Sequence, residues 1–324
     1  MESKIKKIGV LTSGGDAPGM NAAIRSVVRT AISKYGMEVK GILRGYAGLI
    51  DDELIDMDYH AVCDIIHHGG TILYTARCKE MMTEEGQKRA AEVCKKHGIE
   101  GLVVIGGDGS FRGAQKLSAL GINTIGVPGT IDLDIACTEY TIGFDTAINT
   151  AMECIDKIRD TSTSHERISI VEVMGRKAGY IALYTGIAGG AEDILINERY
   201  DGDESAIIEH IKRCQEEGRR HHIIVNAEGI GDSYAMAKRI QAATGIETRA
   251  TVLGHIQRGG TPTCKDRVYA SMMGSVAVDL LALGQSNRVV AYKNGTYTDF
   301  DIEDALAMSK DVNEYMFETA VQLA

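Results

Sequence analysis

Residues 101–110 read Gly-Leu-Val-Val-Ile-Gly-Gly-Asp-Gly-Ser, an apolar run that passes directly into a glycine-rich turn. A continuous apolar run of this length predicts a strand covered on both faces, here Gly101–Ile105. The glycines allow a ligand to approach the backbone, and the helix expected after them offers N–H groups to a phosphate. Asp108 supplies oxygen ligands, which Mg²⁺ prefers and shares with phosphates. A structural turn has no need of the aspartate, so we interpret Gly106–Ser110 as a nucleotide-binding loop.

Similar apolar runs recur along the chain and alternate with helical patterns. The expected strands, besides Gly101–Ile105, are Ile8–Leu11, Val39–Leu43, Thr124–Val127, Ile168–Val173, His222–Asn226 and Arg288–Ala291. Apolar residues at steps of three and four predict helices over Asp145–Asp160, Ser205–Glu217, Ser233–Thr244 and Asp266–Leu283, the last on Val268, Met272, Val276 and Leu280. This alternation predicts an α/β fold, with parallel strands and helices on both faces of the sheet. Ligands of such sheets bind in the loops that follow the strands.

Two further loops after expected strands carry glycine or paired carboxylates. Residues 12–21 read Thr-Ser-Gly-Gly-Asp-Ala-Pro-Gly-Met-Asn, and adjacent glycines before a helix suit an anion as well as an ordinary turn. Residues 128–134 read Pro-Gly-Thr-Ile-Asp-Leu-Asp. If this segment is extended, Asp132 and Asp134 share one face and Leu133 points the other way. One aspartate accepting a hydroxyl proton, with the other near Mg²⁺, fits phosphoryl transfer, whereas a lone Asp-X-Asp is more often a solvated turn.

Arginines at glycine-flanked positions form a third group of candidates. They occur in Met174-Gly175-Arg176, which follows Ile168–Val173, and in residues 254–260, Gly-His-Ile-Gln-Arg-Gly-Gly, which follow a short strand at Thr251–Leu253. Arg167 and Arg249 lie at strand starts. In an acidic chain, several such arginines indicate forks for phosphate groups. His255, taken by itself, fits a satisfied polar residue better than a ligand.

Composition excludes several classes of function. The formal net charge is −10 and the pI is about 5.4, so we expect no nucleic-acid partner. The 7 cysteines show no Cys-X-X-Cys spacing, which favours free thiols in a reducing cytoplasm over disulfides or structural zinc. No apolar segment is long enough to span a membrane, and the first residues lack the pattern of a signal peptide.

Taken together, six strings of this sequence resemble the bacterial ATP-dependent 6-phosphofructokinase family in order and spacing. They are GVLTSGGDAPGMNAAIR, IGGDGS, PGTID, RDTSTSHERIS, EVMGR and ETRATVLGHIQRGG. The resemblance implies two similar α/β domains, each a mostly parallel sheet with helices on both faces. It implies that residues 1–142 plus 256–306 bind ATP and residues 143–255 plus 307–324 bind the sugar phosphate. It also implies a homotetramer, in which Arg167 and Arg249 reach into the site of a neighbouring subunit.

The resemblance further implies the reaction of a glycolytic kinase, ATP plus fructose 6-phosphate giving ADP and fructose 1,6-bisphosphate. Asp132 matches the general base, Asp108 a Mg²⁺ ligand, and Asp134, Arg176 and Thr130 the remaining catalytic positions. The positions that match ATP contacts are Gly15, Arg77, Cys78, Gly107, Asp108, Gly109 and Ser110. The positions that match sugar-phosphate contacts are Thr130, Ile131, Asp132, Arg167, Met174, Gly175, Arg176, Glu228, Arg249, His255, Ile256, Gln257 and Arg258.

Two glycines bear on the phosphoryl donor, and one residue departs from the family. The pyrophosphate-dependent branch carries a bulkier acidic residue and a lysine at the positions of Gly109 and Gly129, so we expect ATP as donor. The family usually has asparagine where this chain has Leu133. We expect that change to affect packing and little else.

The effector site of the family, which takes ADP or phosphoenolpyruvate, is matched less well. Its positions correspond to Arg25, Arg29, Arg159, Gly190, Glu192, Arg219, Arg220 and His221. Tyr59 stands where an arginine is expected and Glu217 where a lysine is expected. Each replacement removes a positive charge from an anion site, so we expect a weak or altered effector response.

Three other interpretations stay open. An NAD or lipid kinase would explain Gly106–Ser110 but not the arginine loops at 174–176 and 254–260. A dinucleotide-dependent dehydrogenase is disfavoured, because the first turn lacks Gly-X-Gly-X-X-Gly and no ribose-binding acid is evident. The loop at 106–110 is no Walker A motif either, since no Gly-Lys-Ser/Thr follows. A non-catalytic sugar-phosphate sensor is favoured by Leu133 and disfavoured by the presence of Asp132, Asp108 and Arg176.

Overall fold

The computed structural model describes residues 4–323, which divide into two compact units. The first unit comprises the described residues up to Ile131, then Ile135–Thr146 and Arg258–Lys310. The second comprises Asp132–Asp134, Ala147–Gln257 and the described residues from Asp311 onward. Residues 1–3 and 324, which the predicted domains include, lie outside the described residues. Which ligand each unit binds remains a prediction.

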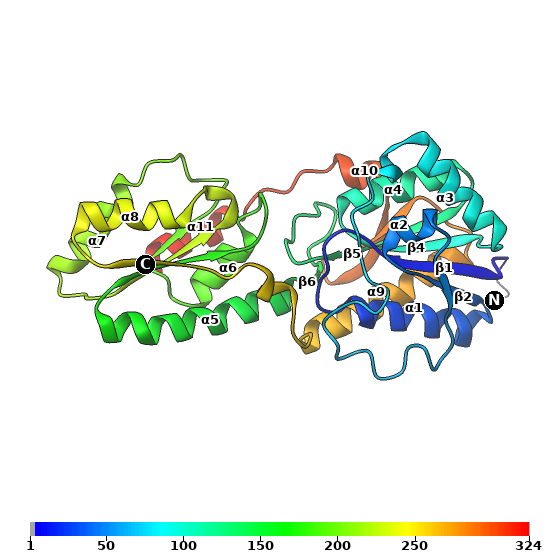
Figure 1. Ribbon diagram of the computed structural model, residues 1–324, viewed down its shortest axis with the longest axis horizontal. Coiled ribbons are helices and arrows are strands. Elements are labelled where there is room, and N and C mark those ends of the chain that lie inside the picture. The colour runs from blue at the N-terminus through cyan, green and yellow to red at the C-terminus, as the bar shows by residue number, and fades with distance from the viewer. Residues whose placement is uncertain (1–3, 324) are drawn as a thin grey trace. The chain divides into compact units, whose positions relative to one another are not determined.

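The first unit is built on an eight-stranded sheet in the order β12-β11-β5-β4-β1-β2-β3, with β6 paired to β5 (Figure 1). Strands β2, β1, β4, β5 and β11 are parallel neighbours, while β3 and β12 are antiparallel edge strands. The strands are β1 (Lys7–Thr12), β2 (Glu38–Ile42), β3 (Leu54–Asp56), β4 (Gly101–Gly106), β5 (Asn123–Thr130), β6 (Ile142–Gly143), β11 (Arg288–Lys293) and β12 (Thr296–Asp301).

Helices cover both faces of this sheet. In Figure 1, α1 and α9 lie below it, and α2, α3, α4 and α10 lie above it. The helices are α1 (Met20–Tyr35), α2 (Gly45–Ile50), α3 (Glu84–Lys96), α4 (Asp108–Ala119), α9 (Cys264–Ala282) and α10 (Ile302–Ala307), with a 3₁₀ turn, η1, at Glu80–Met82. The upper layer shares one core, which includes Leu49, Leu102, Phe111, Leu117 and Ile302, all at most 1% exposed.

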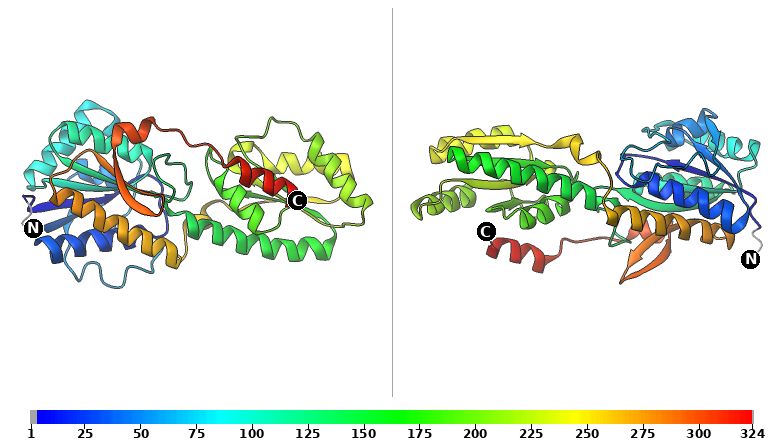
Figure 2. Two further views of the ribbon diagram at one scale, coloured as in Figure 1. Left: turned by 180° about the vertical axis from the view of Figure 1, so that it is seen from behind. Right: turned by 90° about the horizontal axis from the view of Figure 1, so that it is seen from below.

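The second unit is a four-stranded parallel sheet in the order β10-β7-β9-β8 (Figure 2). Its strands are β7 (Ile168–Val173), β8 (Asp193–Leu195), β9 (His222–Ala227) and β10 (Thr248–Val252). Its helical elements are α5 (Phe144–His165), α6 (Tyr180–Ala188), α7 (Ser205–Glu216), η2 (Glu228–Ile230), α8 (Ser233–Thr244), η3 (Gly254–Arg258) and α11 (Glu314–Leu323). Ile207 and Ile211 of α7 and Ile240 of α8 pack on Ile170 and Ile224 of the sheet, so these two helices bury one of its faces.

The α/β fold and all seven strands predicted from the apolar runs are confirmed, with small shifts at strand ends. The predicted helix over Asp266–Leu283 is also present as α9, but its apolar repeat does not face the core. Val268 and Met272 are 51% and 45% exposed, whereas the neighbouring Met273 and Ala277 are fully buried. Small residues let α9 pack closely on α1, because a Cβ at Gly274 would lie 2.7 Å from the carbonyl oxygen of Ala23.

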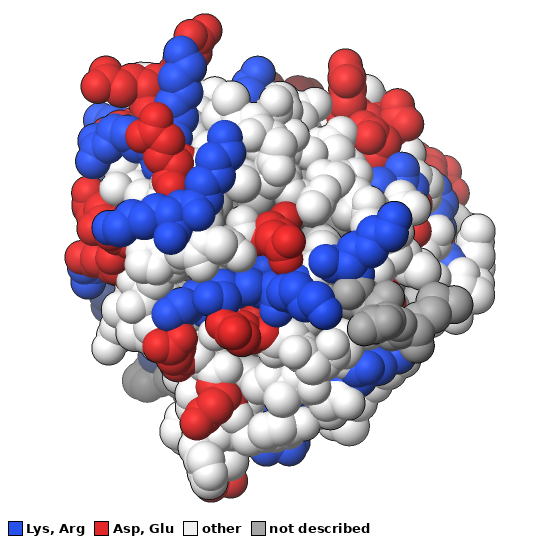
Figure 3. Space-filling model, turned by 90° about the vertical axis from the view of Figure 1, so that its right-hand side faces the viewer, with Lys and Arg blue, Asp and Glu red and all other residues white. Residues whose placement is uncertain are grey.

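Charges of both signs are mixed on the surface (Figure 3), and the cysteines are not paired. On the face drawn in Figure 3, Lys and Arg lie among Asp and Glu, with no large patch of one sign over the described residues. Ion pairs such as Lys7–Glu38 and Lys40–Asp56, both 2.7 Å, are of this mixed kind. All seven cysteines are free thiols. Within residues 4–323, no helix combines the length and apolar character needed to cross a membrane.

Candidate active site

Two glycine loops meet at the carboxyl edge of the first sheet. Strands β1 and β4 are parallel neighbours, and β1 connects through α1 to β2 on its other side, so the crevice between their loops is a topological switch point. The N–H of Ser13 donates to the carbonyl of Ile105 over 2.9 Å, and the Ser110 hydroxyl donates to the carbonyl of Ser13 over 3.1 Å. Residues 12–19 and 106–110, both predicted from sequence as ligand loops, are therefore one connected structure.

The glycines of this crevice fall into two kinds. A Cβ at Gly106 would lie 2.5 Å from both the Ser13 carbonyl oxygen and the Ser110 hydroxyl oxygen, so Gly106 makes the contact between the loops possible. A Cβ at Gly107 or Gly109 would meet no atom within 4 Å. Space is therefore open at the start of α4, and the N-terminus of a helix favours an anion.

Asp108 is the first residue of α4 and its side chain is exposed. Its carboxylate is a hard oxygen donor beside the open space at Gly107 and Gly109. Magnesium sites that carry nucleotide phosphates use one or two carboxylates together with phosphate oxygens and waters. The donor chemistry and the free space at Asp108 therefore fit a Mg²⁺ ion.

Other predicted ligand positions adjoin the same loops in the first unit. Arg258 donates from Nη1 to the carbonyl of Asp16 over 2.9 Å, and a Cβ at Gly15 would lie 2.7 Å from that nitrogen. Thr75 donates to the carbonyl of Gly14 over 2.8 Å, which places the segment leading to Arg77 and Cys78 beside the first loop. Thr130, at the end of β5, and Ile131 are buried and also belong to this unit.

A second group of predicted residues meets in the second unit, at the end of β7. The N–H of Met174 donates to Oε1 of the fully buried Gln257 over 2.8 Å, and the N–H of Arg176 donates to Oε1 of Glu228 over 2.5 Å. The Arg176 guanidinium is 70% exposed and lies 3.7 Å from a carboxylate oxygen of Asp134. A backbone held by Glu228 and an exposed guanidinium suit a group that must bind a phosphoryl oxygen.

The segment with the two aspartates differs from the extended form considered from sequence. Leu133 has φ 56°, in the left-handed region, so Asp132 and Asp134 are not separated by a regular extended residue. Leu133 is 5% exposed and Asp132 is 2% exposed. The leucine side chain is thus buried, which agrees with an effect on packing. Left-handed φ also explains why asparagine suits this position, since it tolerates that region better than leucine.

Arg167 and Arg249 lie at the opposite edge of the second sheet from Arg176. Both are near the amino ends of their strands, and β7 and β10 pair in parallel. The Arg249 Nε donates to Glu247 over 2.7 Å, and Arg167 lies 3.8 Å from the same carboxylate. That hydrogen bond, followed by the charge of Arg249, lowers the pKa of Glu247. These two arginines are therefore not part of the cluster around Arg176. His255 and Ile256, in η3, are exposed.

The predicted effector residues form separate groups. Arg159 donates to the carbonyls of Gly189 and Gly190, each over 2.6 Å, and lies 3.5 Å from Glu192. Arg220 is paired with Glu166 at 2.6 Å. In the first unit, the Arg29 guanidinium lies over the ring of Tyr59, 5.9 Å from its centroid. The tyrosine therefore interacts with a predicted effector residue. Arg25 lies on α1, Arg219 lines a cavity with Glu192 and Glu217, and His221 directly precedes β9.

Asn197 and Asp266 are supporting residues that were not singled out as site residues from the sequence, and Gln257 has a supporting contact that the sequence did not indicate. Gln257 was named only by resemblance as a ligand, and here its amide holds the backbone of Met174. Asn197 donates to the carbonyl of Arg176 over 3.3 Å. The fully buried Asp266 accepts hydrogen bonds from Tyr140, Gly143 and Thr146. Their partners are distant in sequence, so no local pattern marks them.

The fold and these loops define a sugar-phosphate kinase architecture, and the chain belongs to the phosphofructokinase family. The model of that family, described as "Phosphofructokinase", matches residues 7–281.

Among curated relatives, the chain is 58% identical to the ATP-dependent 6-phosphofructokinase of Clostridium botulinum (strain Hall), over 99% of this chain and 100% of the relative. It is 56% identical to the enzyme of the same name from Clostridium acetobutylicum, with the same coverage.

Solved structures agree with the assignment. Phosphofructokinase from Saccharomyces cerevisiae matches with a TM-score of 0.87 and 33% identity, over 98% of this chain and 46% of the yeast chain. Pichia pastoris phosphofructokinase in the T-state matches with a TM-score of 0.88 and 34% identity, over 100% of this chain and 38% of the other. This chain thus spans less than half of each yeast chain. A pyrophosphate-dependent phosphofructokinase from Marinobacter aquaeolei shares the fold, with a TM-score of 0.85 at 24% identity.

Proposed function

We propose that this chain is an enzyme that transfers the γ-phosphoryl group of ATP to the 1-hydroxyl of fructose 6-phosphate, giving fructose 1,6-bisphosphate and ADP. The observation that carries this proposal is 58% identity, over 99% of the chain, to curated relatives named ATP-dependent 6-phosphofructokinase. The reaction needs positioning and neutralisation of charge more than covalent chemistry from the protein.

Asp132 is proposed as the general base that takes the proton from the sugar hydroxyl. Its 2% exposure means that the packing around it limits its orientation, and a general base must be held in position to accept the proton. Asp134 and Thr130 flank it in sequence, and Arg176 provides the positive charge for the transferring group. A group that stabilises such charge commonly contributes a factor of about 10²–10³ in rate.

Asp108 would hold Mg²⁺ together with phosphate oxygens of ATP. When bound, Mg²⁺ supplies neutralisation of the phosphate charge that develops during transfer. The residues of this chain do the rest: the open space at Gly107 and Gly109 admits the phosphates, and the N-terminus of α4 favours their charge. Gly15, Arg77, Cys78 and Ser110 complete the proposed nucleotide site.

Two glycines support ATP over pyrophosphate as donor. A side chain at Gly109 would project into the open space at the start of α4, where we place the phosphates. At Gly129 a Cβ would lie 3.0 Å from Cγ2 of Ile105 and 3.1 Å from Cε of Met20. A lysine there would need these side chains to move, whereas a side chain at Gly109 would fit but would take up the space proposed for the phosphates.

The proposed sugar-phosphate site uses both sets of arginines. One set would act within the same subunit, and it consists of Arg176, Arg258, Met174, Gly175, Glu228, His255, Ile256 and Gln257. Arg167 and Arg249 would act in a neighbouring subunit of a homotetramer, which their position away from Arg176 supports. The exposed apolar residues Val268 and Met272 of α9 support self-association as well, because a surface of this kind is stabilised when another protein covers it.

An anionic effector, ADP or phosphoenolpyruvate, is proposed for the groups around Arg29 and Arg159. The response is expected to be weak or altered, because Tyr59 lies against the guanidinium of Arg29 and Glu217 adds negative charge. A cytoplasmic location, expected from the free thiols, stays a prediction.

A coupled assay with ATP, Mg²⁺ and fructose 6-phosphate tests the proposal. We expect activity with ATP and much weaker activity with pyrophosphate. We expect Asp132→Asn to lower kcat by about 10²–10⁴, since it removes the base, with KM values nearly unchanged. Asp201→Asn, in an exposed loop, is the matched control and keeps full activity.

The contrary outcomes are distinct. A wild-type chain that binds fructose 6-phosphate but shows no turnover would be a sensor, and one that prefers pyrophosphate would contradict the donor assignment. Full activity of the Asp132→Asn variant would show that Asp132 is not the general base, while the assignment as a kinase would stand.

A further inference from the structure

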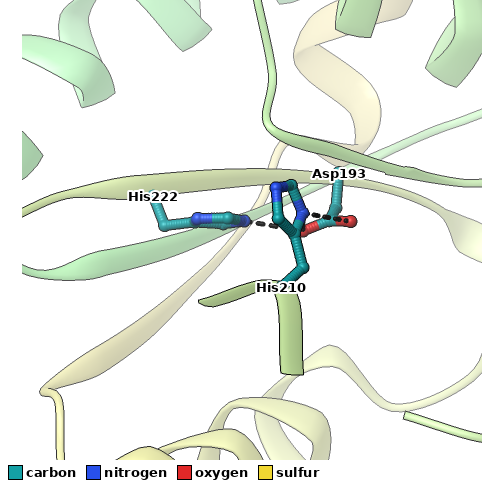
Figure 4. A group of neighbouring side chains, drawn as sticks. All are labelled: Asp193, His210 and His222. Atoms are coloured by element: carbon teal, nitrogen blue, oxygen red, sulfur yellow. Dashed lines mark hydrogen bonds and ion pairs between the residues drawn. The ribbon is translucent and has the colours of Figure 1, made fainter. Parts of the chain in front are cut away.

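Two histidines and an aspartate meet in the second unit, beside the predicted effector residues Glu192 and His221. Asp193 is on β8, His210 on α7 and His222 on β9, and Figure 4 shows both rings directed at the one carboxylate. His210 Nδ1 lies 3.2 Å and 3.3 Å from the two oxygens of Asp193, and His222 Nε2 lies 2.6 Å from Oδ2. The ring centroids are 5.2 Å apart with an interplanar angle of 81°. One nitrogen of each histidine thus converges on one point.

We propose that Asp193, His210 and His222 form a binding site for a divalent transition-metal ion, Zn²⁺ in the first instance. His210 Nδ1, His222 Nε2 and one Asp193 oxygen would be the ligands, and these atoms lie within 4.8 Å of one another. Two imidazole nitrogens and a carboxylate form a donor set that suits Zn²⁺, whereas Mg²⁺ and Ca²⁺ prefer oxygen ligands alone.

The distances require little rearrangement. With zinc–ligand bonds of about 2.0–2.2 Å, tetrahedral geometry places the ligand atoms about 3.3–3.5 Å apart. The 3.2 Å between His210 Nδ1 and Asp193 Oδ2 already has that value. The 2.6 Å between His222 Nε2 and the same oxygen must lengthen by less than about 1 Å, which a small carboxylate rotation supplies.

A cavity gives an ion a route to the cluster. Asp193 and His210 line a cavity of about 480 Å³ between β8, α7 and α11, whose wall also includes Glu192, Glu217 and Phe317. His222 is 2% exposed and closes the site from the side of the sheet. Three protein ligands with a fourth position toward a cavity are typical of sites that exchange water or a ligand. The wall carries the carboxylates of Glu192 and Glu217 and the guanidinium groups of Arg213 and Arg219, so its charges balance and the attraction for a cation comes from Asp193 itself.

A hydrogen-bonded triad without metal is the competing explanation. Both rings, when neutral, can donate one N–H to Asp193. His222 Nδ1 is buried and has no hydrogen-bond partner among the described residues. When Nε2 binds an ion, the ring proton is on Nδ1, where it has no acceptor. The missing hydrogen bond lowers the affinity for the ion. We therefore expect micromolar rather than nanomolar affinity.

Titration of the metal-depleted full-length chain with Co²⁺ separates the two explanations. We expect visible d–d absorption that saturates at one Co²⁺ per chain, is reversed by Zn²⁺ and survives excess Mg²⁺. Asp193→Asn and His210→Gln should each weaken Co²⁺ binding at least about tenfold, because even partners of metal ligands have effects of that size. Zn²⁺ should also raise the thermal unfolding midpoint of the wild type, since the three ligands converge only in the folded chain.

The matched control is His97→Gln. His97 Nε2 lies 2.5 Å from Asp52, so this variant loses a histidine–aspartate contact that has no second imidazole. It should bind Co²⁺ as the wild type does. Absence of saturable one-to-one binding, or equal binding by wild type and both ligand variants, would overturn the proposal. No substrate is present in these measurements, so their outcome is independent of the kinase activity.

Discussion

At the scale of single residues, burial decides what a side chain contributes, and the chain sequence does not display it. Asp132 and Asp134 are two residues apart, yet Asp132 is 2% exposed while the Asp134 side chain is 32% exposed and pairs with Arg176. A lone Asp-X-Asp reads as a solvated turn. Only the resemblance to a family singled out Asp132, and only the fold buries it.

Asp266 gives a prediction at this scale. It accepts hydrogen bonds from the backbone N–H groups of Gly143 and Thr146, at 2.7 Å and 2.8 Å. In Asp266→Asn, an amide NH₂ would face at least one of these donors. We expect the free energy of unfolding to fall by about 1–3 kcal/mol, the cost of an unsatisfied buried donor. Urea denaturation measures it.

The control is Asp279→Asn on the same helix, which removes the charge from a surface ion pair with Lys34, while its amide oxygen can still accept the hydrogen bond from the Tyr35 hydroxyl; it should cost less than about 1 kcal/mol. Equal losses in both variants would contradict the role given to Asp266.

The pH dependence of the same residue provides a second readout. Burial raises the pKa of Asp266 above its usual 3.8. The folded chain therefore takes up this proton at higher pH than the unfolded chain, and the group's contribution to stability increases as pH falls toward 3.8. Asparagine does not titrate, so the stability of wild type relative to Asp266→Asn should rise as the pH falls toward 3.8.

At the scale of helices and strands, local patterns predicted the elements better than their faces. The apolar repeat of α9 predicted a helix, and the helix is present. Its buried apolar side, however, is formed by Ala270, Met273, Gly274, Ala277, Val278 and Leu281, and Gly274 lets α9 pack closely against α1. Apolar periodicity assigns a core face only where the largest residues are the buried ones.

The contact between α9 and α1 predicts the effect of Gly274→Val. The added Cβ would lie 2.7 Å from the carbonyl oxygen of Ala23, a backbone atom that cannot rotate away. We expect a loss of about 1–3 kcal/mol in the free energy of unfolding, measured by urea denaturation. Ser275→Ala, on the next position of the helix, should change it by no more than about 0.5 kcal/mol. Unchanged stability of Gly274→Val would show that the helices can separate freely.

Strand β12 was not predicted, although the sequence contains a signal for it. Strands β11 and β12 form a hairpin whose turn is Asn294-Gly295, with φ of 51° and 77°. An Asn-Gly pair between β-rich runs is typical of a two-residue hairpin turn. The edge strand β3, only three residues long, had no comparable signal.

At the scale of the whole molecule, the exposed apolar residues of α9 predict how the chain associates. Met272 is 45% exposed beside Val268, so Met272→Asp would place a charge in a contact that a second copy would cover. We expect light scattering to show a smaller assembly than for the wild type.

Met82→Asp, at an 83% exposed position in η1, is the control and should keep the assembly. A tetramer that persists in Met272→Asp would mean that the copies meet on other surfaces.

The sequence by itself determined the α/β class, the seven main strands and the glycine and arginine loops, because these depend on local patterns of apolar residues and turns. The sequence also determined the family resemblance, since that resemblance rests on short strings of residues in a given order. Only the tertiary structure decided that Ser110 ties the two glycine loops together, that Gln257 holds Met174, and that Asp193 meets two histidines. The physical reason is that these contacts join residues on separate strands and helices, and their distances exist only once the sheets have formed.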